Sequence, residues 1–330
     1  MDRRRFLALS ATTALLLTGC GRLLREEAPD GSASPREHPT TEAEAPREAP
    51  STSEPPPTST SEEQPDQAAS EEQGAEGDEE GVTDGEGRGE ESDAEVVEDP
   101  QLDPELVEAA PSEWGESVAG VGTRLAGTSA IALTLDACGG PGGSGYDRAL
   151  VGVLREHAVP ATLFINSRWL QANQEAFAEL ASDPLFEIAN HGTEHRPLSV
   201  NGRSVYGITG TASAEHVVDE VLDCQRELTE LTGEVPRFFR SGTAYYDDVA
   251  VKIVHALGLE VAGYSVLGDA GATFSASQVR AALLGAQPGS IVLLHMNHPS
   301  SGTAEGVAAA VGELIDRGTT FTTLGRHELV

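Results

Sequence analysis

Residues 130–137 read AIALTLDA, and residues 146–158 read YDRALVGVLREHA. The first stretch is a continuous apolar run that ends on a carboxylate, which is typical of a strand buried on both faces of a sheet. The second stretch places apolar residues at helical spacing. Together they predict a strand followed by a helix, which is the repeating unit of a parallel sheet.

The same alternation continues to the end of the chain. Further strands are expected at 161–167, 185–190, 237–240, 260–267, 290–295 and 320–325, and helices at 173–182, 213–233, 247–258, 275–286 and 304–318. Ser213 is the expected N-cap of the long helix, and Gly233 its stop. Seven such strands predict an α/β fold, either a distorted (β/α) barrel of about seven parallel strands or an open doubly wound sheet.

The loop after the first strand helps to choose between these two architectures. An open doubly wound sheet that binds a nucleotide has a glycine-rich phosphate loop at this place. Residues 136–145, DACGGPGGSG, are glycine-rich but do not contain the lysine of a P-loop. We therefore favour the barrel and expect a flexible loop here.

The first 118 residues have a different composition. Residues 1–20, MDRRRFLALSATTALLLTGC, predict an export signal with a twin-arginine-like start and a lipobox, after which Cys20 would carry lipid. An ordinary secretory signal is the alternative. Residues 21–118 hold 30 acidic and 5 basic residues and few large hydrophobic ones, which predicts a disordered tether. We therefore expect an extracytoplasmic protein, lipid-anchored to the cell membrane.

Residues 119–330 are long enough for one folded domain. They carry −10 of the total net charge of −33, which argues against a nucleic-acid partner because phosphate binding requires lysine and arginine patches. Cys138 and Cys224 could pair outside the cytoplasm or remain buried thiols.

Polar side chains gather at the carboxyl ends of the predicted strands. They are Asp136, His191, His195, Arg240, Asp269 and His295. Each could be structural alone: Asp136 could cap the next segment, and His295 could be a buried core histidine. In a parallel barrel, however, these strand ends meet at one face, where barrel enzymes have their active sites. Their convergence predicts a catalytic or metal-binding site.

The stretches that carry these residues also resemble a known family. They are ALTLDA (132–137), ATLFINSRWL (161–170), FEIANHGTEH (186–195), RFFRSGTAYYD (237–247) and SIVLLH (290–295). In order and spacing they are similar to the NodB homology domain of the polysaccharide deacetylases, carbohydrate esterase family four. The resemblance implies a distorted barrel that hydrolyses acetyl groups, N-acetyl above all, on peptidoglycan or chitin-like glycans with one divalent metal.

The resemblance also implies residue roles. Asp136 would be the catalytic base, Arg240 its orienting partner and His295 the general acid, while His191 and His195 would bind the metal. Ala137 stands where the family has a third, carboxylate ligand. Asp136 could supply that ligand instead, with Cys138 as a second candidate. We expect zinc, because neutral imidazole suits it and catalytic zinc has three protein ligands.

The substrate contacts are less well defined by the sequence. By resemblance, backbone N–H groups near Thr243 would stabilise the oxyanion, Gly242 replaces the usual proline, and Tyr245 and Asp269 are candidate substrate contacts. Three functions stay open: a metal-dependent glycan deacetylase, a non-catalytic glycan-binding lipoprotein, and a hydrolase of another non-peptide amide.

Overall fold

The computed structural model describes residues 101–330, so the expected signal, Cys20 and most of the expected tether lie outside it. Its largest element is an eight-stranded sheet in which every paired neighbour is parallel. In spatial order its strands are β11 (Val266–Leu267), β12 (Ile291–His295), β3 (Ala132–Ala137), β4 (Ala161–Ile165), β5 (Phe186–Asn190), β8 (Phe238–Phe239), β10 (Glu260–Ala262) and β2 (Val121–Gly122).

Two small antiparallel pairs lie beside this sheet. They join β1 (Trp114–Gly115) to β9 (Tyr246–Asp247), and β6 (Ser204–Val205) to β7 (Ile208–Thr209). The helices are α1 (Pro104–Val107), α2 (Arg148–Glu156), α3 (Ser167–Ala172), α4 (Gln174–Ala181), α5 (Ala214–Thr232), α6 (Asp248–Ala256), α7 (Ala276–Leu284), α8 (Thr303–Asp316) and the 3-10 turn η1 (Leu324–Arg326).

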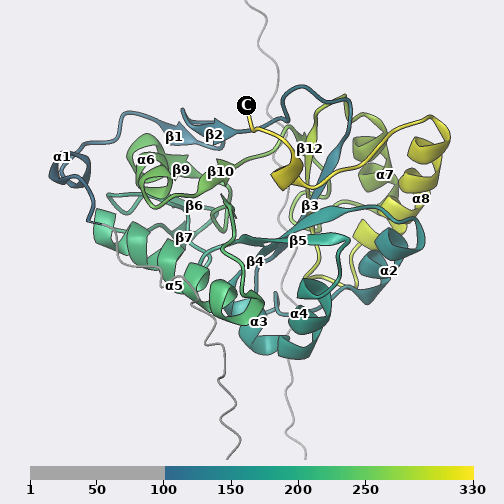
Figure 1. Ribbon diagram of the computed structural model, residues 1–330, viewed down its shortest axis with the longest axis horizontal. Coiled ribbons are helices and arrows are strands. Elements are labelled where there is room, and N and C mark those ends of the chain that lie inside the picture. The colour runs from purple at the N-terminus through teal and green to yellow at the C-terminus, as the bar shows by residue number, and fades with distance from the viewer. Residues whose placement is uncertain (1–100) are drawn as a thin grey trace, which may run out of the picture. The chain divides into compact units, whose positions relative to one another are not determined.

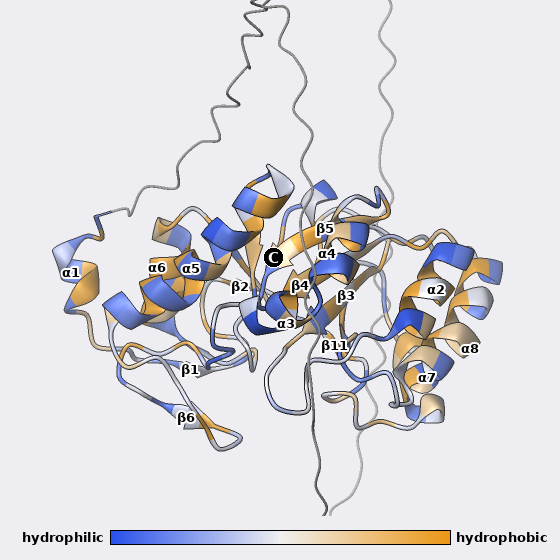
Figure 2. Ribbon diagram, turned by 90° about the horizontal axis from the view of Figure 1, so that it is seen from below, coloured by the Kyte–Doolittle hydropathy of each residue, from blue (hydrophilic) through white to orange (hydrophobic). Residues whose placement is uncertain are grey.

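The sheet is curled into an incomplete barrel, with its helices outside (Figure 1). Helices α2, α7 and α8 pack together on one side and α5 packs against α6 on the other. Figure 2 shows that these helices carry both polar and apolar residues, as expected where only one face is buried. Within residues 101–330, no strand pairing joins β11 to β2, so the barrel is open between them.

Strand β3 shows how the sheet separates core from site. Leu133, Leu135 and Ala137 pack into the core under the helices, where they are fully buried. Because side chains alternate along a strand, Thr134 and Asp136 point to the other face, the inside of the curled sheet. The register then pairs Asp136 with His295 of β12, so these two residues lie side by side.

The fold expected from the sequence is confirmed, and most elements lie where they were predicted. Helix α5 begins after Ser213, whose side chain accepts a hydrogen bond from the amide of His216, and ends at Gly233 in the left-handed conformation. The glycine-rich loop, expected to be flexible, is instead closed by its own hydrogen bonds, from the Gly139 amide to Gly143 and from the Gly143 amide to Gly140.

Two predicted strands differ from the structure. The segment 260–267 is divided into β10 and β11, because the carbonyls of Ala262 and Gly263 turn inward and accept hydrogen bonds from Arg240. The segment 320–325 forms only a single bridge, from Phe321 to Ile131, before it turns into η1. The eighth strand of the sheet is β2, which the sequence analysis did not predict.

The folded domain begins earlier than the expected residue 119. Strand β1 pairs with β9, and the Asp248 carboxylate accepts hydrogen bonds from the amides of Ser112 and Glu113. This segment has few large apolar residues, which is why its composition resembled that of the tether. Within the part of the chain that the structure covers, no helix is both long and apolar enough to cross a membrane.

Candidate active site

The centre of the site is a buried ion pair between Asp136 and Arg240. The Arg240 Nη1 donates to Asp136 Oδ1 at 2.7 Å and to the Thr134 hydroxyl at 2.8 Å. The other donors of Arg240 bind the carbonyls of Ala262 and Gly263, and its guanidinium lies 4.1 Å from the centre of the Phe164 ring. These contacts fix the carboxylate at the end of β3.

His191 follows β5 directly, and its two ring nitrogens have separate roles. Its Nδ1 lies 2.9 Å from the Arg240 carbonyl, so Nδ1 carries the proton and donates it. The lone pair is then on Nε2, which lies 3.6 Å from Asp136 Oδ2 and 3.7 Å from Cys138 Sγ. Burial lowers the pKa of His191, but the Asp136 carboxylate and the Cys138 thiol outweigh it and raise the pKa.

His195 lies on the loop that follows, in a left-handed backbone conformation (φ 62°) that is unusual for a residue other than glycine. The amides on both sides of it, of Glu194 and Arg196, donate to the buried Glu220 carboxylate. A Cβ on Gly242 would collide with the backbone and ring of His195. Gly242, where the family usually has proline, therefore leaves room for this histidine.

Three potential metal ligands meet at this point. The ligand atoms of Cys138, His191 and His195 all lie within 4.8 Å of one another, and Asp136 is not one of this set. The buried Nε2 of His195 has no hydrogen-bond partner in the part of the chain that the structure describes. Two imidazoles and a thiol are ligands that suit zinc, so these residues fit a zinc ion.

His295, at the end of β12, is held by a second buried carboxylate. Asp269 accepts hydrogen bonds from the His295 Nδ1 at 2.8 Å, from its backbone amide at 2.7 Å and from the Thr303 hydroxyl at 3.0 Å. Burial lowers the pKa of His295, but the Asp269 carboxylate and the Cys138 thiol outweigh it and raise the pKa well above its ordinary value. Asp269 is fully buried, so it positions His295 and does not contact substrate as we had expected.

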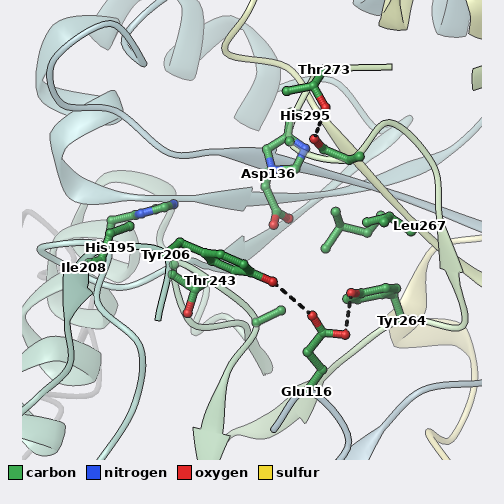
Figure 3. A pocket seen from close by; sticks show the side chains of 15 residues that line it. Glu116, Asp136, His195, Tyr206, Ile208, Thr243, Tyr264, Leu267, Thr273 and His295 are labelled. Atoms are coloured by element: carbon green, nitrogen blue, oxygen red, sulfur yellow. Dashed lines mark hydrogen bonds between the residues drawn. The ribbon is translucent and has the colours of Figure 1, made fainter. Parts of the chain in front are cut away.

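Asp136, His195 and His295 open into one cavity of about 470 Å³ (Figure 3). Thr243 lies on its wall, and the Thr243 hydroxyl is buried with no partner among the described residues. Tyr245 was expected to contact substrate, but its ring packs against Trp114 and Tyr206, and it is not among the residues that line the cavity.

The opposite rim of the cavity was not expected from the sequence. Glu116 accepts a hydrogen bond from Tyr264 at 2.8 Å and one from Tyr206 at 3.5 Å, as Figure 3 shows. Glu116 lies in the segment taken for tether, and Tyr206 is at the tip of the β6–β7 hairpin. Tyr206 is unusually exposed, at 70%, and exposure of this kind cannot be read from the sequence.

Comparison with known proteins agrees with this geometry. Residues 125–262 match the sequence model of a family described as polysaccharide deacetylase. Over these residues the chain is similar to the polysaccharide deacetylases. The matched region includes Asp136, Cys138, both site histidines and Arg240, whereas His295 lies beyond it. No curated protein matches the chain.

Solved structures share the fold of this domain. A pseudoenzyme of carbohydrate esterase family 4 from Bacillus anthracis is 22% identical with a TM-score of 0.51, over 61% of this chain and 66% of that one. PdaA from Bacillus subtilis, a family 4 carbohydrate esterase, is 21% identical with a TM-score of 0.53, over 63% and 84% of the two chains. At these identities the likeness concerns the fold alone.

Proposed function

We propose that this domain is a metal-dependent hydrolase that removes acetyl groups, N-acetyl groups above all, from a glycan such as peptidoglycan or a chitin-like polymer. Similarity to the polysaccharide deacetylases supports glycan deacetylation in general. One observation of this structure carries the proposal further. Asp136 and His295 face the same cavity from neighbouring strands, and each is held by its own buried partner.

Asp136 is suited to be the general base. Arg240 occupies Oδ1, which fixes the carboxylate and leaves Oδ2 to accept a proton from a water molecule in the cavity. Because the Arg240 charge is also bound by two backbone carbonyls, it is not free to move away from the carboxylate.

His295 is suited to be the general acid. Its raised pKa keeps the imidazole protonated, and because Nδ1 is bound to Asp269, the Nε2 proton is the one it can give. That proton would go to the amide nitrogen as the bond between nitrogen and the acetyl carbon breaks. The water's hydroxyl group stays on the acetyl carbon, so the products are acetate and a free amine.

His191 and His195 would hold the metal, with a third ligand from Cys138 or Asp136. A bound divalent metal polarises an acetyl carbonyl and lowers the pKa of a coordinated water. Around it, the chain's own residues orient the acetyl group: Thr243 places an unpaired hydroxyl on the cavity wall. Donors at this position stabilise the negative charge that develops on the carbonyl oxygen.

Acetate release by the intact protein from N-acetylated chitin oligosaccharides and from peptidoglycan tests this proposal. We expect His295→Gln, which keeps the size of the side chain, to lower kcat by about 10²–10⁴-fold. Gln278→Glu on the distant helix α7 is a matched surface control. No acetate release from either glycan, combined with glycan binding, would favour a non-catalytic glycan-binding protein. Activity on a non-glycan amide alone would favour the third candidate function.

We also propose that the protein acts outside the cytoplasm, attached to the membrane by lipid on Cys20. The apolar segment of residues 6–19 and the lipobox LTGC support this location. Mass spectrometry of the membrane fraction should find a mature chain that begins at lipidated Cys20. A chain cut elsewhere, or an unmodified Cys20, would contradict the proposal.

A further inference from the structure

The direction of the side chains along strand β3 indicates which residue replaces the missing carboxylate ligand. Ala137 packs into the core under the helices together with Leu133 and Leu135, so its side chain is directed away from the site. Alternation along the strand returns the next residue, Cys138, to the side of Asp136. The Cys138 thiol then meets the Nε2 of His191 at 3.7 Å.

A tight turn holds Cys138 in this place. Gly139 adopts a left-handed conformation (φ 71°), and a Cβ on it would collide with the backbone of Arg168 and Trp169 at the start of α3. The Gly139 amide donates to the Gly143 carbonyl, and Asn297 donates to the same carbonyl. The glycine-rich loop therefore fixes the thiol beside the two histidines.

The spacing of the ligand atoms agrees with one bound ion. Zinc binds sulfur at about 2.3 Å and imidazole nitrogen at about 2.0–2.1 Å, which places the two ligand atoms about 3.6 Å apart at a tetrahedral angle. The observed distance between Cys138 Sγ and His191 Nε2 is 3.7 Å. This distance is close to the one expected for a shared zinc ion, and the ligand atom of His195 lies within 4.8 Å of both.

Each histidine has a ring nitrogen that a ligand could use. The Arg240 carbonyl accepts the proton of His191 Nδ1 and so leaves the Nε2 lone pair facing Cys138 Sγ at 3.7 Å and Asp136 Oδ2 at 3.6 Å. Such a hydrogen bond to the distal nitrogen is the usual way in which a metal-binding histidine is oriented. The Nε2 of His195 is buried and has no partner among the described residues. An unpaired buried nitrogen is costly unless a ligand occupies it.

We propose that the metal of this deacetylase is held by Cys138, His191 and His195, with the thiolate in place of the carboxylate that Ala137 cannot provide. The inference rests on the proposed function for the presence of a metal and adds the ligand set. Binding releases the thiol proton to solvent, and the fourth coordination position stays open for water. Asp136 then acts as the base and is not a metal ligand.

This ligand set changes which metal is preferred. Carboxylate and carbonyl oxygens suit Mg²⁺, Ca²⁺ and Mn²⁺, whereas thiolate and imidazole select zinc and its chemical relatives. We therefore expect the site to bind Zn²⁺ and Co²⁺ in strong preference to Mg²⁺ or Mn²⁺.

The test is a spectrum of the intact protein loaded with Co²⁺, because a Co²⁺–thiolate bond gives an intense charge-transfer absorption in the near ultraviolet. Wild-type protein should show this band with about one metal per chain. The matched control is Cys224→Ser, since the thiol of Cys224 is buried and bound to the Ile165 carbonyl. That variant should keep the band and the metal.

Cys138→Ser should lose the band, and its zinc affinity should fall by more than about 100-fold, because even the loss of a residue that only orients a ligand costs 10–100-fold. Cys138→Asp should bind metal without the band, which separates loss of a ligand from loss of the fold. Unchanged metal affinity in Cys138→Ser would overturn the inference. So would a wild-type protein without metal whose activity is abolished by thiol alkylation, since Cys138 would then be a nucleophile.

These results are independent of the test of activity. A protein that binds zinc through Cys138 and releases no acetate would refute the proposed function and leave the ligand assignment intact. A deacetylase that loses its zinc in Asp136→Asn but not in Cys138→Ser would refute the ligand assignment and leave the proposed function intact.

Discussion

The Asp136 carboxylate is almost completely buried, with 3% of the residue exposed, and it forms a buried ion pair with Arg240. Removing a single partner of a buried ion pair leaves an uncompensated charge, which costs about 3–5 kcal/mol. We predict that Arg240→Met lowers the free energy of unfolding by this amount in urea titrations. Adding Asp136→Asn should recover part of the loss, because the unpaired charge is then gone. A double variant less stable than Arg240→Met would contradict the coupling.

The Asp269 carboxylate is the main cause of the raised pKa of His295, which burial alone would lower. A general acid works while it is protonated, so activity should be lost as pH rises through the pKa of His295. In Asp269→Asn that pKa falls, and the alkaline limb of the pH profile of kcat should move to lower pH by about one unit or more. The control is Thr303→Val, which removes a hydrogen bond to the Asp269 carboxylate but keeps its charge. An unmoved limb in Asp269→Asn would exclude His295 as the titrating acid.

At the scale of elements, helix α5 holds the loop of the two histidines through Glu220. Burial raises the pKa of this carboxyl to about 7 from its ordinary 4.5. The folded protein then binds a proton that the unfolded chain has released, so stability falls as pH rises between these values, by up to about 3 kcal/mol. In Glu220→Gln this fall should be absent. Urea titrations at about pH 5 and pH 7.5 measure it, with Glu230→Gln on the exposed face of α5 as control.

The β6–β7 hairpin brings Tyr206 to the cavity rim opposite Asp136 and His295. An exposed ring beside a carboxylate offers a flat apolar face and a hydrogen-bond acceptor, the two features that a sugar ring can use. We predict that Tyr206→Ala raises KM for a glycan about tenfold with little change in kcat, whereas Tyr206→Phe stays close to wild type. A fall in kcat alone in Tyr206→Ala would place the ring in the chemistry instead.

The sequence was sufficient to predict which residues meet at the ends of the strands. Asp136, His191, Arg240 and His295 follow apolar runs, so parallel pairing alone brings them together. Glu220 left a weaker signal, a carboxylate on the same helical face as Val217 and Val221. The Glu116–Tyr264 contact spans 148 positions between two irregular segments, and no local pattern specifies such a pairing.

The proposed third metal ligand shows the same limit of prediction from sequence. Sequence alone left Asp136 and Cys138 as alternatives, because both are next to Ala137, whose side chain cannot bind a metal. We infer that Cys138 is the ligand, because the turn at Gly139 places its thiol beside ring nitrogens of both histidines, whereas Arg240 binds Oδ1 of Asp136.

For the whole molecule, the boundary between tether and domain determines what a truncated protein would lose. A chain that starts at residue 119 lacks α1, β1 and Glu116, whereas one that starts at 101 keeps them. Asp248 is the main anchor of this segment. Burial raises the pKa of its carboxyl, but the amides of Glu113 and Ser112 outweigh burial and lower it.

We predict that residues 119–330 are less stable than residues 101–330 by about 2–4 kcal/mol, because several hydrogen bonds of about 0.5–1.5 kcal/mol each are lost together with the pairing of β1 and β9. Thermal unfolding of the two proteins measures the difference. Asp248→Asn in the longer protein should reproduce part of it. Equal melting temperatures would mean that the segment packs on the domain without stabilising it. Because Glu116 links Tyr206 and Tyr264, the shorter protein should also bind glycan less tightly, even under conditions where it is fully folded.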